Sequence, residues 1–458
     1  MISSETLKGI NVKHSLFGAE IKPGFKVSTD SRSIQTGDMF IALVGDKFDG
    51  FSYLEEVIAK GASSVVFQQK IGRRFKHLIK KYPETTFIET DDTLLFLQEL
   101  AREHKKSWQQ SGTKTTIALT GSNGKTTHKE MLKHLLSSLF PGKVLATKGN
   151  LNNHIGVPLT LLELSPDHDI AIVEMGMNHR HEIMTLCKIA EPSHGLITNI
   201  GQAHIGFLGS MQNIYFEKSD LYRWVKKFTH GFGKFVVNAD DEYLRLLESS
   251  TGLTTFGESF GDIKVHIANN EIRFNFRGQA VAVKNPQIQE EYNLRNLVCT
   301  MILAMKLFPD KVSEITTAAS TYVQPSMNRS EWVNHIFLDA YNANPSSMKA
   351  SLNSFIKIIE EKSAKLDECF FVMGDMNELG DFAEELHAEM ANYVQSLGIK
   401  NVVFVGRYKE YYLKGNPNAL GGFLEKEDFL KQFPNFKSDY KWIFIKGSRS
   451  VKLETLLS

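Results

Sequence analysis

A short glycine-rich segment restricts what this chain can fold into more than any other feature. The apolar run Ile117–Leu119 leads into Thr120–Thr127, which reads TGSNGKTT and opens a helix-like stretch. A strand that ends in such a turn can direct successive backbone N–H groups at phosphate oxygens, with Lys125 reaching the outer phosphates and the Thr126 hydroxyl binding Mg²⁺. The residues predicted to hold the phosphates are Gly121, Ser122, Asn123, Gly124, Lys125, Thr126 and Thr127.

The loop departs from the general pattern G-x-x-x-x-G-K-[ST] at one position, because Leu119 stands where that pattern has its first glycine. Glycine-rich turns are common, so the residues T-G alone would mean little. The G-K-T-T that follows a β-rich run favours phosphate binding over a plain strand-to-helix turn.

Length and charge limit the remaining choices. A chain of 458 residues has room for about three domains of roughly 150 residues, and its net charge of +1 offers no strong field to hold nucleic acid or an anionic membrane. No apolar run approaches the roughly 20 residues that span a bilayer, and the first residues do not resemble a secretory signal. Three scattered cysteines indicate neither a disulfide framework nor a zinc site. We expect a cytoplasmic monomer that binds no nucleic acid and does not enter a membrane.

Strands and helices alternate along most of the chain, which predicts an α/β fold of parallel βαβ units. Residues 1–105 read as a small α/β unit, and residues 106–323 as a central unit whose parallel sheet carries the phosphate loop. Within it, residues 253–285 hold shorter alternating segments, which indicate antiparallel strands at the edge of the sheet. Residues 324–458 are predicted to form a third, doubly wound unit.

The first unit contains two polar segments at predicted turns. Ser28–Arg32 gathers hydroxyls, a carboxylate and a guanidinium, and Lys47–Gly50 is a turn-rich loop. Such a cluster could hold a nucleotide or sugar phosphate. Composition alone favours a solvated polar turn.

Two polar residues of the central unit follow strand-like runs. Glu174 ends Asp169–Glu174, and His204 lies just after Gly195–Ile200. Ligands gather at the carboxyl ends of strands in open parallel sheets, so both residues fall on the edge that carries the phosphate loop. A Mg²⁺ ligand is the natural role for Glu174, with a solvated strand-end acid as the alternative. His204 fits a metal ligand and a structural histidine equally well.

Three residues on predicted helices are ambiguous by pattern. Lys218 lies in a charged helical stretch, where a solvated surface lysine is the expected interpretation. Asn293 and Asn296 are three positions apart and share one helix face. Their amides could read an adenine edge or serve as capping or surface groups.

Two charged residues of the third unit could contact a nucleotide. Asp339 ends an apolar strand and could accept hydrogen bonds from ribose hydroxyls, while Arg329 could neutralise a phosphate. A surface ion pair is the alternative for each. The acid-rich turn Gly374–Gly380 could face an amine-bearing substrate, although as an isolated pattern it is only a loop.

Taken in order, these segments resemble one family. The phosphate loop, the run GNLNNHIGVPLT at Gly149–Thr160 and the run VEMGMN at Val173–Asn178 are similar to those of the ATP-dependent Mur ligases, which build the peptide stem of bacterial peptidoglycan. Three later segments resemble the members of that family that act last. These are DAYNANP at Asp339–Pro345, GDMNELG at Gly374–Gly380 and KGSR at Lys446–Arg449.

The resemblance implies an ATP-dependent amide ligase. It would join D-alanyl-D-alanine to UDP-N-acetylmuramoyl-tripeptide through an acyl phosphate, with Mg²⁺ as cofactor. The three units would then be a UDP-sugar-binding domain (1–105), a central ATP-binding domain (106–323) and a Rossmann-like C-terminal domain that binds the dipeptide (324–458).

The resemblance also implies roles for the ambiguous residues. Lys125, Lys218 and Arg329 would be catalytic, and Lys218 matches a lysine that is carbamylated in many relatives. The implied metal-binding positions are Thr126, Glu174, His204 and Lys218. ATP would be bound by the phosphate loop together with Asn293, Asn296, Arg329 and Asp339. The UDP-sugar side would consist of Ser28, Thr29, Asp30, Ser31, Arg32, Lys47, Asp49 and Gly50.

Two positions depart from the family pattern. Many relatives carry two consecutive acids before the residue that precedes Tyr-Asn-Ala-Asn-Pro, whereas Leu338-Asp339 keeps only the second. The glycine that usually precedes the phosphate-contacting arginine is replaced by Asn328. Both changes concern fine geometry, because Asp339 and Arg329 themselves are present.

Other functions fit parts of the sequence. A related amide ligase could add a diamino acid or glutamate, but the diamino-acid enzyme usually has an Asp-Asn-Pro-Arg segment that this sequence lacks. A phosphate-loop ATPase or GTPase acting as a switch or motor would hydrolyse nucleotide without a carboxylate substrate. A nucleotide-binding scaffold without turnover is disfavoured by Lys125, Thr126 and Glu174.

Overall fold

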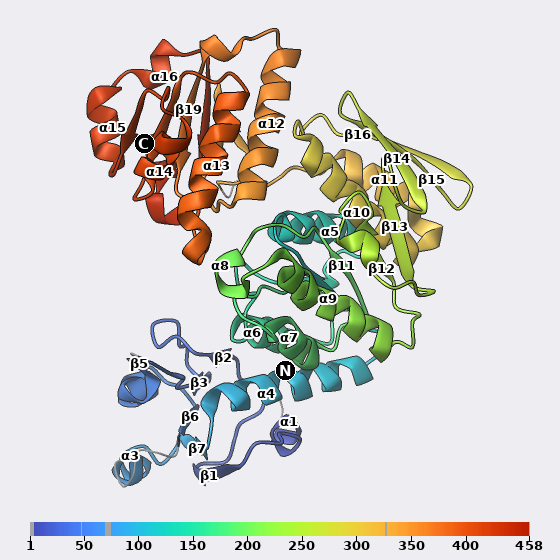
Figure 1. Cartoon of the computed structure of the whole chain (residues 1–458). Helices are drawn as coiled ribbons and strands as arrows, with labels where there is room; N and C mark the ends of the chain where they lie inside the picture. Colours follow the sequence, from blue (N-terminus) through green and yellow to red (C-terminus); the bar gives the residue numbers. More distant parts are fainter. Residues whose placement is uncertain (1–3, 47, 69–74, 326–327, 458) are drawn as a thin grey trace.

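Three large sheets follow one another along the described chain, and a two-stranded antiparallel sheet of β4 (Val44–Gly45) and β5 (Phe48–Asp49) belongs to the first unit. The computed structural model describes residues 4–46, 48–68, 75–325 and 328–457. The unit that holds the second sheet lies between the other two, and α4 runs between the first unit and the central one (Figure 1). Parallel strands separated by helices make up most of each sheet, so the predicted α/β fold is confirmed.

The first sheet has five strands in the order β1-β7-β6-β3-β2, and only β1 is antiparallel to its neighbour. Met39 and Ile41 pack on one face, whereas Phe40 packs on the other, as the two-residue period of a strand requires. Its strands are β1 (His14–Gly18), β2 (Val27–Ser28), β3 (Met39–Ile41), β6 (Ser64–Gln68) and β7 (Thr86–Thr90). The accompanying elements are α1 (Ser4–Lys8), β4 (Val44–Gly45), β5 (Phe48–Asp49), η1 (Gly50–Tyr53), α2 (Leu54–Ala59) and α3 (Phe75–Lys81).

A long helix, α4 (Thr93–Gln110), connects the first unit to the central one. Asp92 caps its start by accepting a hydrogen bond from the Leu95 backbone N–H. Phe96 packs into the core of the first sheet, while Trp108 packs into the core of the central unit. The predicted boundary between residues 105 and 106 falls inside this helix.

The central sheet has nine strands in the order β16-β15-β14-β13-β12-β11-β8-β10-β9. The strands from β9 to β14 are parallel, and β14, β15 and β16 form the antiparallel edge that the sequence predicted. The strands are β8 (Thr115–Thr120), β9 (Val144–Ala146), β10 (Ile170–Glu174), β11 (His194–Ile197), β12 (Phe235–Asn238), β13 (Leu253–Gly257), β14 (Ile263–Ala268), β15 (Glu271–Phe276) and β16 (Gln279–Lys284).

Helices cover both faces of the central sheet. α5, α10 and α11 pack on one face, and α6, α7 and α9 on the other. The helical elements are α5 (Lys125–Leu139), α6 (Gly156–Leu162), α7 (Glu182–Ala190), α8 (Ile205–Leu208), α9 (Met211–Phe228), η3 (Leu244–Leu246), α10 (Glu291–Leu307), η4 (Pro309–Lys311) and α11 (Val312–Ser320). This arrangement leaves the carboxyl ends of β8, β10 and β11 at one open edge.

The third sheet has six strands in the order β17-β18-β22-β19-β20-β21, and only β17 is antiparallel. The strands are β17 (Glu331–Val333), β18 (Ile336–Asp339), β19 (Cys369–Gly374), β20 (Val402–Val405), β21 (Gly421–Phe423) and β22 (Trp442–Lys446). The helical elements are α12 (Pro345–Glu361), η5 (Leu366–Glu368), η6 (Gly380–Phe382), α13 (Ala383–Ser396), α14 (Lys409–Gly415), α15 (Lys426–Gln432), α16 (Phe436–Asp439), η7 (Arg449–Val451) and η8 (Leu453–Leu457).

Cys187, Cys299 and Cys369 are buried free thiols. Across the described ranges, no helix is both long enough and apolar enough to cross a membrane.

Candidate active site

A cavity of about 530 Å³ lies where the central and third units meet. It opens at the carboxyl ends of β8 and β10, where parallel sheets bind ligands. The predicted site residues that line it are Ser122, Asn123, Gly124, Lys125, Thr126, Thr127, Glu174, His204, Asn293, Asn296, Arg329 and Asp339.

The phosphate loop has the geometry that its glycines predict. Gly121 and Gly124 have φ of +150° and +74°, which favour glycine, and a Cβ on Gly121 would lie 1.8 Å from Thr198 Oγ1. The backbone N–H groups of Ser122 and Asn123 donate to Asn199, so they are already engaged. In the part of the chain that the structure describes, the first N–H groups of α5, which starts at Lys125, remain as donors for a phosphate.

Two lysines converge on one carbonyl of the loop. Lys125 Nζ donates to Gly121 O at 2.8 Å, and Lys218 Nζ donates to the same oxygen at 3.1 Å. Burial lowers the pKa of Lys125, and burial together with the nearby Lys125 lowers the pKa of Lys218 well below its usual value. The prediction of a solvated Lys218 from charge pattern is wrong, because this side chain is 1% exposed.

Glu174 is a buried carboxylate with an unused oxygen. Its Oε1 accepts hydrogen bonds from Asn152 Nδ2 at 2.8 Å and from Thr126 Oγ1 at 3.3 Å. Its Oε2 finds no hydrogen-bond partner among the described residues. An orphaned, 1% exposed carboxylate oxygen beside a threonine hydroxyl suits a hard cation such as Mg²⁺.

His204 contacts the third unit. Its Nδ1 lies 2.7 Å from Glu378 Oε2, and both residues have left-handed φ, of +62° and +64°. Burial lowers the pKa of His204, and the neighbouring imidazole lowers the pKa of Glu378. No group of three or more His, Cys, Asp or Glu side chains in the described ranges is arranged to hold a metal by itself. A cation here would therefore need Thr126 or a modified Lys218 as a further ligand.

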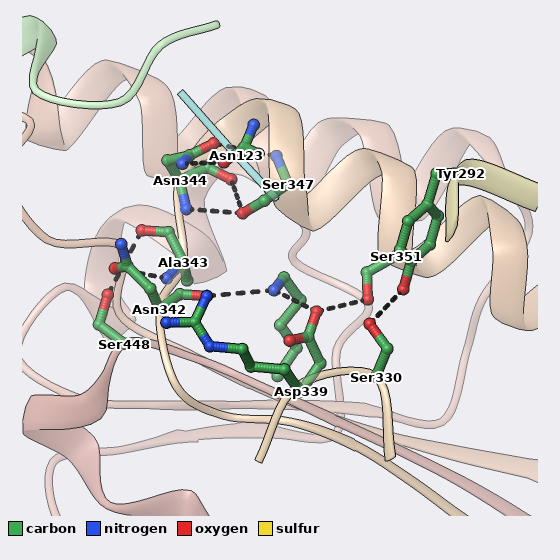
Figure 2. Close-up of polar contacts among 12 residues, drawn as sticks. Asn123, Tyr292, Ser330, Asp339, Asn342, Ala343, Asn344, Ser347, Ser351 and Ser448 are labelled. Atoms are coloured by element: carbon green, nitrogen blue, oxygen red, sulfur yellow. Dashed lines mark hydrogen bonds and ion pairs between the residues drawn. The ribbon is translucent and has the colours of Figure 1, made fainter. Parts of the chain in front are cut away.

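Polar groups from both units that line the cavity meet around Asp339 (Figure 2). Asp339 Oδ2 accepts from Ser351 Oγ at 2.8 Å and from the buried Lys446 Nζ at 2.6 Å. Tyr292 Oη and Ser330 Oγ lie 2.5 Å apart beside this pair. On α10, Asn296 Nδ2 donates to Asn293 Oδ1 at 3.1 Å, so these two amides do meet on one helix face.

Arg329 stacks on an aromatic ring. Its guanidinium carbon lies 3.8 Å from the centre of the Tyr341 ring, and its Nε is buried without a hydrogen-bond partner among the described residues. Asn328 precedes it with φ of +55°, a conformation that asparagine tolerates better than most residues. Asparagine at this position can therefore adopt the left-handed backbone conformation that a glycine would allow.

Comparison with known proteins identifies the family. Family models match three successive stretches: the Mur ligase family catalytic domain at residues 26–105, the Mur ligase middle domain at 119–304, and the Mur ligase glutamate ligase domain at 328–417. A UDP-N-acetylmuramoyl-tripeptide–D-alanyl-D-alanine ligase from Bacillus subtilis (strain 168) is 30% identical over 444 residues, covering 94% of this chain and 92% of its own. The chain belongs to the Mur ligase family. Mur ligases are ATP-dependent amide ligases, as the sequence predicted.

Further relatives agree with this assignment. The Haemophilus influenzae ligase of the same name is 30% identical over 469 residues, covering 96% of this Mur ligase and 94% of its own chain. A crystal structure of MurF from Acinetobacter baumannii is 28% identical, with a TM-score of 0.82 over 99% of this chain and 97% of its own. MurF from Thermotoga maritima, solved with ADP, has the same fold, with 23% identity and a TM-score of 0.77 over 94% and 96% of the two chains. The predicted three-domain fold is thereby confirmed.

The predicted UDP-sugar residues of this Mur ligase lie apart from the central cavity. Asp30 and Arg32 form an exposed pair at 2.7 Å, and Asp49 caps η1 by accepting from the Phe51 backbone N–H. Gly50 is buried, and a Cβ there would meet the Ala42 backbone at 2.8 Å. Ser28 ends β2, and Thr29 and Ser31 follow it in the next turn, whereas Lys47 lies outside the described residues. The role of these residues stays a prediction.

Sequence reasoning missed four residues that shape the site of this Mur ligase. Glu290 accepts a hydrogen bond from Asn293, and Asn344 contacts the phosphate loop. Glu378 contacts His204, and Lys446 pairs with Asp339. Each contact joins segments that are far apart in sequence or contributed by different units, except the one at Glu290. The adjacent acids Glu290-Glu291 before Asn293 were the only local signal for that residue.

Proposed function

We propose that this Mur ligase joins D-alanyl-D-alanine to UDP-N-acetylmuramoyl-tripeptide and converts ATP to ADP and phosphate. The supporting observation is similarity to ligases of that name over 94% of this chain and 92% of the relative. The acid-rich turn that brings Glu378 to His204 fits an amine substrate approaching from the third unit.

The three units divide the substrates in this proposal. Residues 1–105 bind the UDP-sugar, residues 106–323 bind ATP, and residues 324–458 bind the dipeptide. Ser28 ends β2 and Thr29–Arg32 follow it, whereas Asp49 ends β5 and Gly50 begins η1, in the segment that follows β3. Since β2 and β3 are adjacent parallel strands, both segments leave the sheet at the same edge. Since units of one chain complete the cavity, we infer that the enzyme acts as a monomer, and we place it in the cytoplasm.

The terminal carboxylate of the tripeptide is a poor electrophile for an amine, so it must first be activated as an acyl phosphate. The terminal carboxylate of the tripeptide attacks the γ-phosphorus of ATP, the bond to the β-phosphate oxygen breaks, and ADP leaves. Lys125 and Arg329 are positioned to offset the negative charge of the transferred group. The dipeptide amine then attacks the acyl carbon and loses a proton, and phosphate departs as the amide forms. Holding three substrates in line is the contribution of the cavity between the units.

Magnesium would be held by residues of the central unit. Thr126 and Glu174 form one candidate pair, and His204 with a carbamylated Lys218 forms another. When bound, Mg²⁺ neutralises phosphate charge and orients the phosphoryl oxygens. The lowered pKa of Lys218 favours the neutral amine, which is the form that reacts with CO₂ to give a carbamate.

Phosphate release from ATP tests this function. We expect release only when UDP-N-acetylmuramoyl-tripeptide and D-alanyl-D-alanine are both present, with a product whose mass is the sum of the two minus water. Release without either partner would instead support a switch or motor ATPase. Replacing the dipeptide by glutamate, or the acceptor by its dipeptide precursor plus a diamino acid, tests the related ligases, and turnover in those arms would contradict the proposed substrate.

A further inference from the structure

A buried carboxylate anchors the two asparagines that are proposed to face the base. Glu290 is 4% exposed and immediately precedes α10. Its Oε1 accepts from Trp332 Nε1 at 3.1 Å, and its Oε2 accepts from Asn293 Nδ2 at 3.3 Å. Asn293 Oδ1 in turn accepts from Asn296 Nδ2 at 3.1 Å. The four side chains therefore form one continuous hydrogen-bond chain.

The chemistry of the end groups sets the direction of this chain. An indole N–H can only donate, and a carboxylate can only accept. Asn293 must then turn its NH₂ toward Glu290 and its carbonyl toward Asn296. The NH₂ group of Asn296 donates to that carbonyl. Asn296 Oδ1 is left over. It accepts no hydrogen bond within the described ranges, and Asn296 lines the cavity.

Two neighbouring polar side chains on α10 are engaged with other described residues. The Tyr292 hydroxyl is engaged with Ser330, and Arg295 pairs with Glu258 and Glu291 on the outer side of α10. Burial raises the pKa of Glu290, whereas the hydrogen bonds from Asn293 and Trp332 lower it. Trp332 belongs to β17 of the third unit, so the chain is complete only when that unit packs on α10.

We propose that Glu290 is a positioning residue for base selection, which orients Asn293 and Asn296 so that a carbonyl oxygen meets position 6 of the purine. A 6-amino group donates to that oxygen, whereas a 6-oxo group would place oxygen against oxygen. The site therefore selects 6-aminopurine nucleotides over 6-oxopurine nucleotides. This inference rests on the proposed ATP-binding role of Asn293 and Asn296.

Three nucleotides test the wild-type enzyme. ATP, purine riboside triphosphate and ITP differ around position 6, which carries an amine, a hydrogen and an oxo group. We expect kcat/KM for ligation to fall about 10-fold from ATP to the unsubstituted purine, since one hydrogen bond is lost, and further for ITP. ITP that works as well as or better than the unsubstituted purine nucleotide would overturn the proposal. Asn296 would then present its NH₂ group, and not its carbonyl oxygen, to position 6.

Glu290→Gln tests the orientation directly. The glutamine carbonyl must accept from Trp332, which turns its NH₂ toward Asn293 and reverses both asparagine amides. We expect the ITP-to-ATP ratio of kcat/KM to rise at least about 10-fold. Glu314→Gln, an exposed position on α11, is the matched control and should leave the ratio unchanged.

The outcomes separate the two proposals. A purely structural role for Glu290 would lower both kcat/KM values equally, and an unchanged ratio would overturn the inference. If Glu290→Gln does not fold, the wild-type nucleotide series still decides. Absence of ligation with every nucleotide would instead contradict the proposed function, whereas ligation without base selection would contradict only this inference.

Discussion

Asn344 Nδ2 donates a hydrogen bond to Asn123 Oδ1 at 2.7 Å, which joins the start of α12 in the third unit to the phosphate loop of the central unit (Figure 2). Asn123 Nδ2 donates in return to Ser346 Oγ at 2.9 Å. Asn344 also caps α12, because its Oδ1 accepts from the Ser347 backbone N–H. The loop that is proposed to hold ATP is therefore tied to the unit that is proposed to hold the amine.

Asn344→Ser separates the contact with Asn123 from the capping of α12. Serine is also a good N-cap, but its side chain is too short to reach Asn123. We expect kcat for ligation to fall about 10-fold or more, with the melting temperature nearly unchanged, because the third unit is no longer held against the loop. Asn353→Ser, an exposed position on the same helix, is the control. Wild-type kcat in Asn344→Ser would show that the contact does not matter for turnover.

A second contact between these units depends on two glycines. A Cβ on Gly206 in α8 would lie 2.3 Å from the Gly380 backbone nitrogen in η6. Gly206→Ala must therefore push the third unit away from His204, and we expect at least about a 10-fold loss of kcat with little change in ATP affinity. Gly45→Ala, where a Cβ meets nothing within 4 Å, should behave as wild type. Unchanged kcat in Gly206→Ala would mean that the reactive arrangement does not need this contact.

Lys125→Ala tests phosphoryl transfer. The Lys125 ammonium donates a hydrogen bond to the Gly121 carbonyl, and the residue itself begins α5. Without the ammonium, charge on the transferred group is less well offset, so we expect turnover to fall at least about 100-fold in a folded protein. Lys133→Ala, on the exposed side of the same helix, should keep activity. Turnover in a folded Lys125→Ala protein at the wild-type rate would contradict the assigned role.

Lys218→Ala tests carbamylation. If the modified lysine supplies a carboxylate, we expect inactivity that formate or acetate partly restores, because a small acid can occupy the space that the side chain leaves. Circular dichroism checks that the variant is folded. Lys125→Ala should show no such rescue, and equal failure of rescue in both variants would count against a carbamate at Lys218.

Local sequence patterns predicted those features of the fold that depend on residues close together in the chain. The alternation of strands and helices placed Glu174 and the phosphate loop on the same sheet edge, as the register of β8 and β10 confirms. Composition could not predict the burial of Lys218, because a charged helix looks the same from sequence whether it faces water or a ligand. The engagement of the Ser122 and Asn123 N–H groups with Asn199 was also invisible, since it depends on how a second loop folds.

Contacts between units were beyond the reach of sequence patterns. Glu378 and His204 belong to different units, and nothing in either motif states that the two side chains meet. The same holds for Asn123 and Asn344. Asn328 is the opposite case, because its left-handed φ explains why asparagine can replace glycine before Arg329. Motifs predicted the reacting groups, whereas the packing of the units determines which of those residues contact one another.

Lys105 couples the stability of the connecting helix to pH. This residue of α4 is 0% exposed, and its Nζ donates to Glu191 O at 3.1 Å and to Glu191 Oε2 at 3.3 Å. Burial lowers its pKa to about 8, although Glu191 opposes the shift. Unfolded lysine binds its proton up to a pKa of about 10.4, so between these values the unfolded chain holds more protons. The destabilisation is therefore complete below pH 8 and disappears as the pH rises toward 10.4.

Lys105→Met removes this titration while keeping an unbranched apolar side chain. We expect the free energy of unfolding of the wild type, relative to Lys105→Met, to increase by about 1 kcal/mol per pH unit above pH 8. Denaturant unfolding at pH 7, 8, 9 and 9.5 measures the difference. Lys106→Met, which changes a more exposed neighbour on the same helix, is the matched control. A difference that is flat or falls with pH would mean that Lys105 keeps an ordinary affinity for its proton inside the fold.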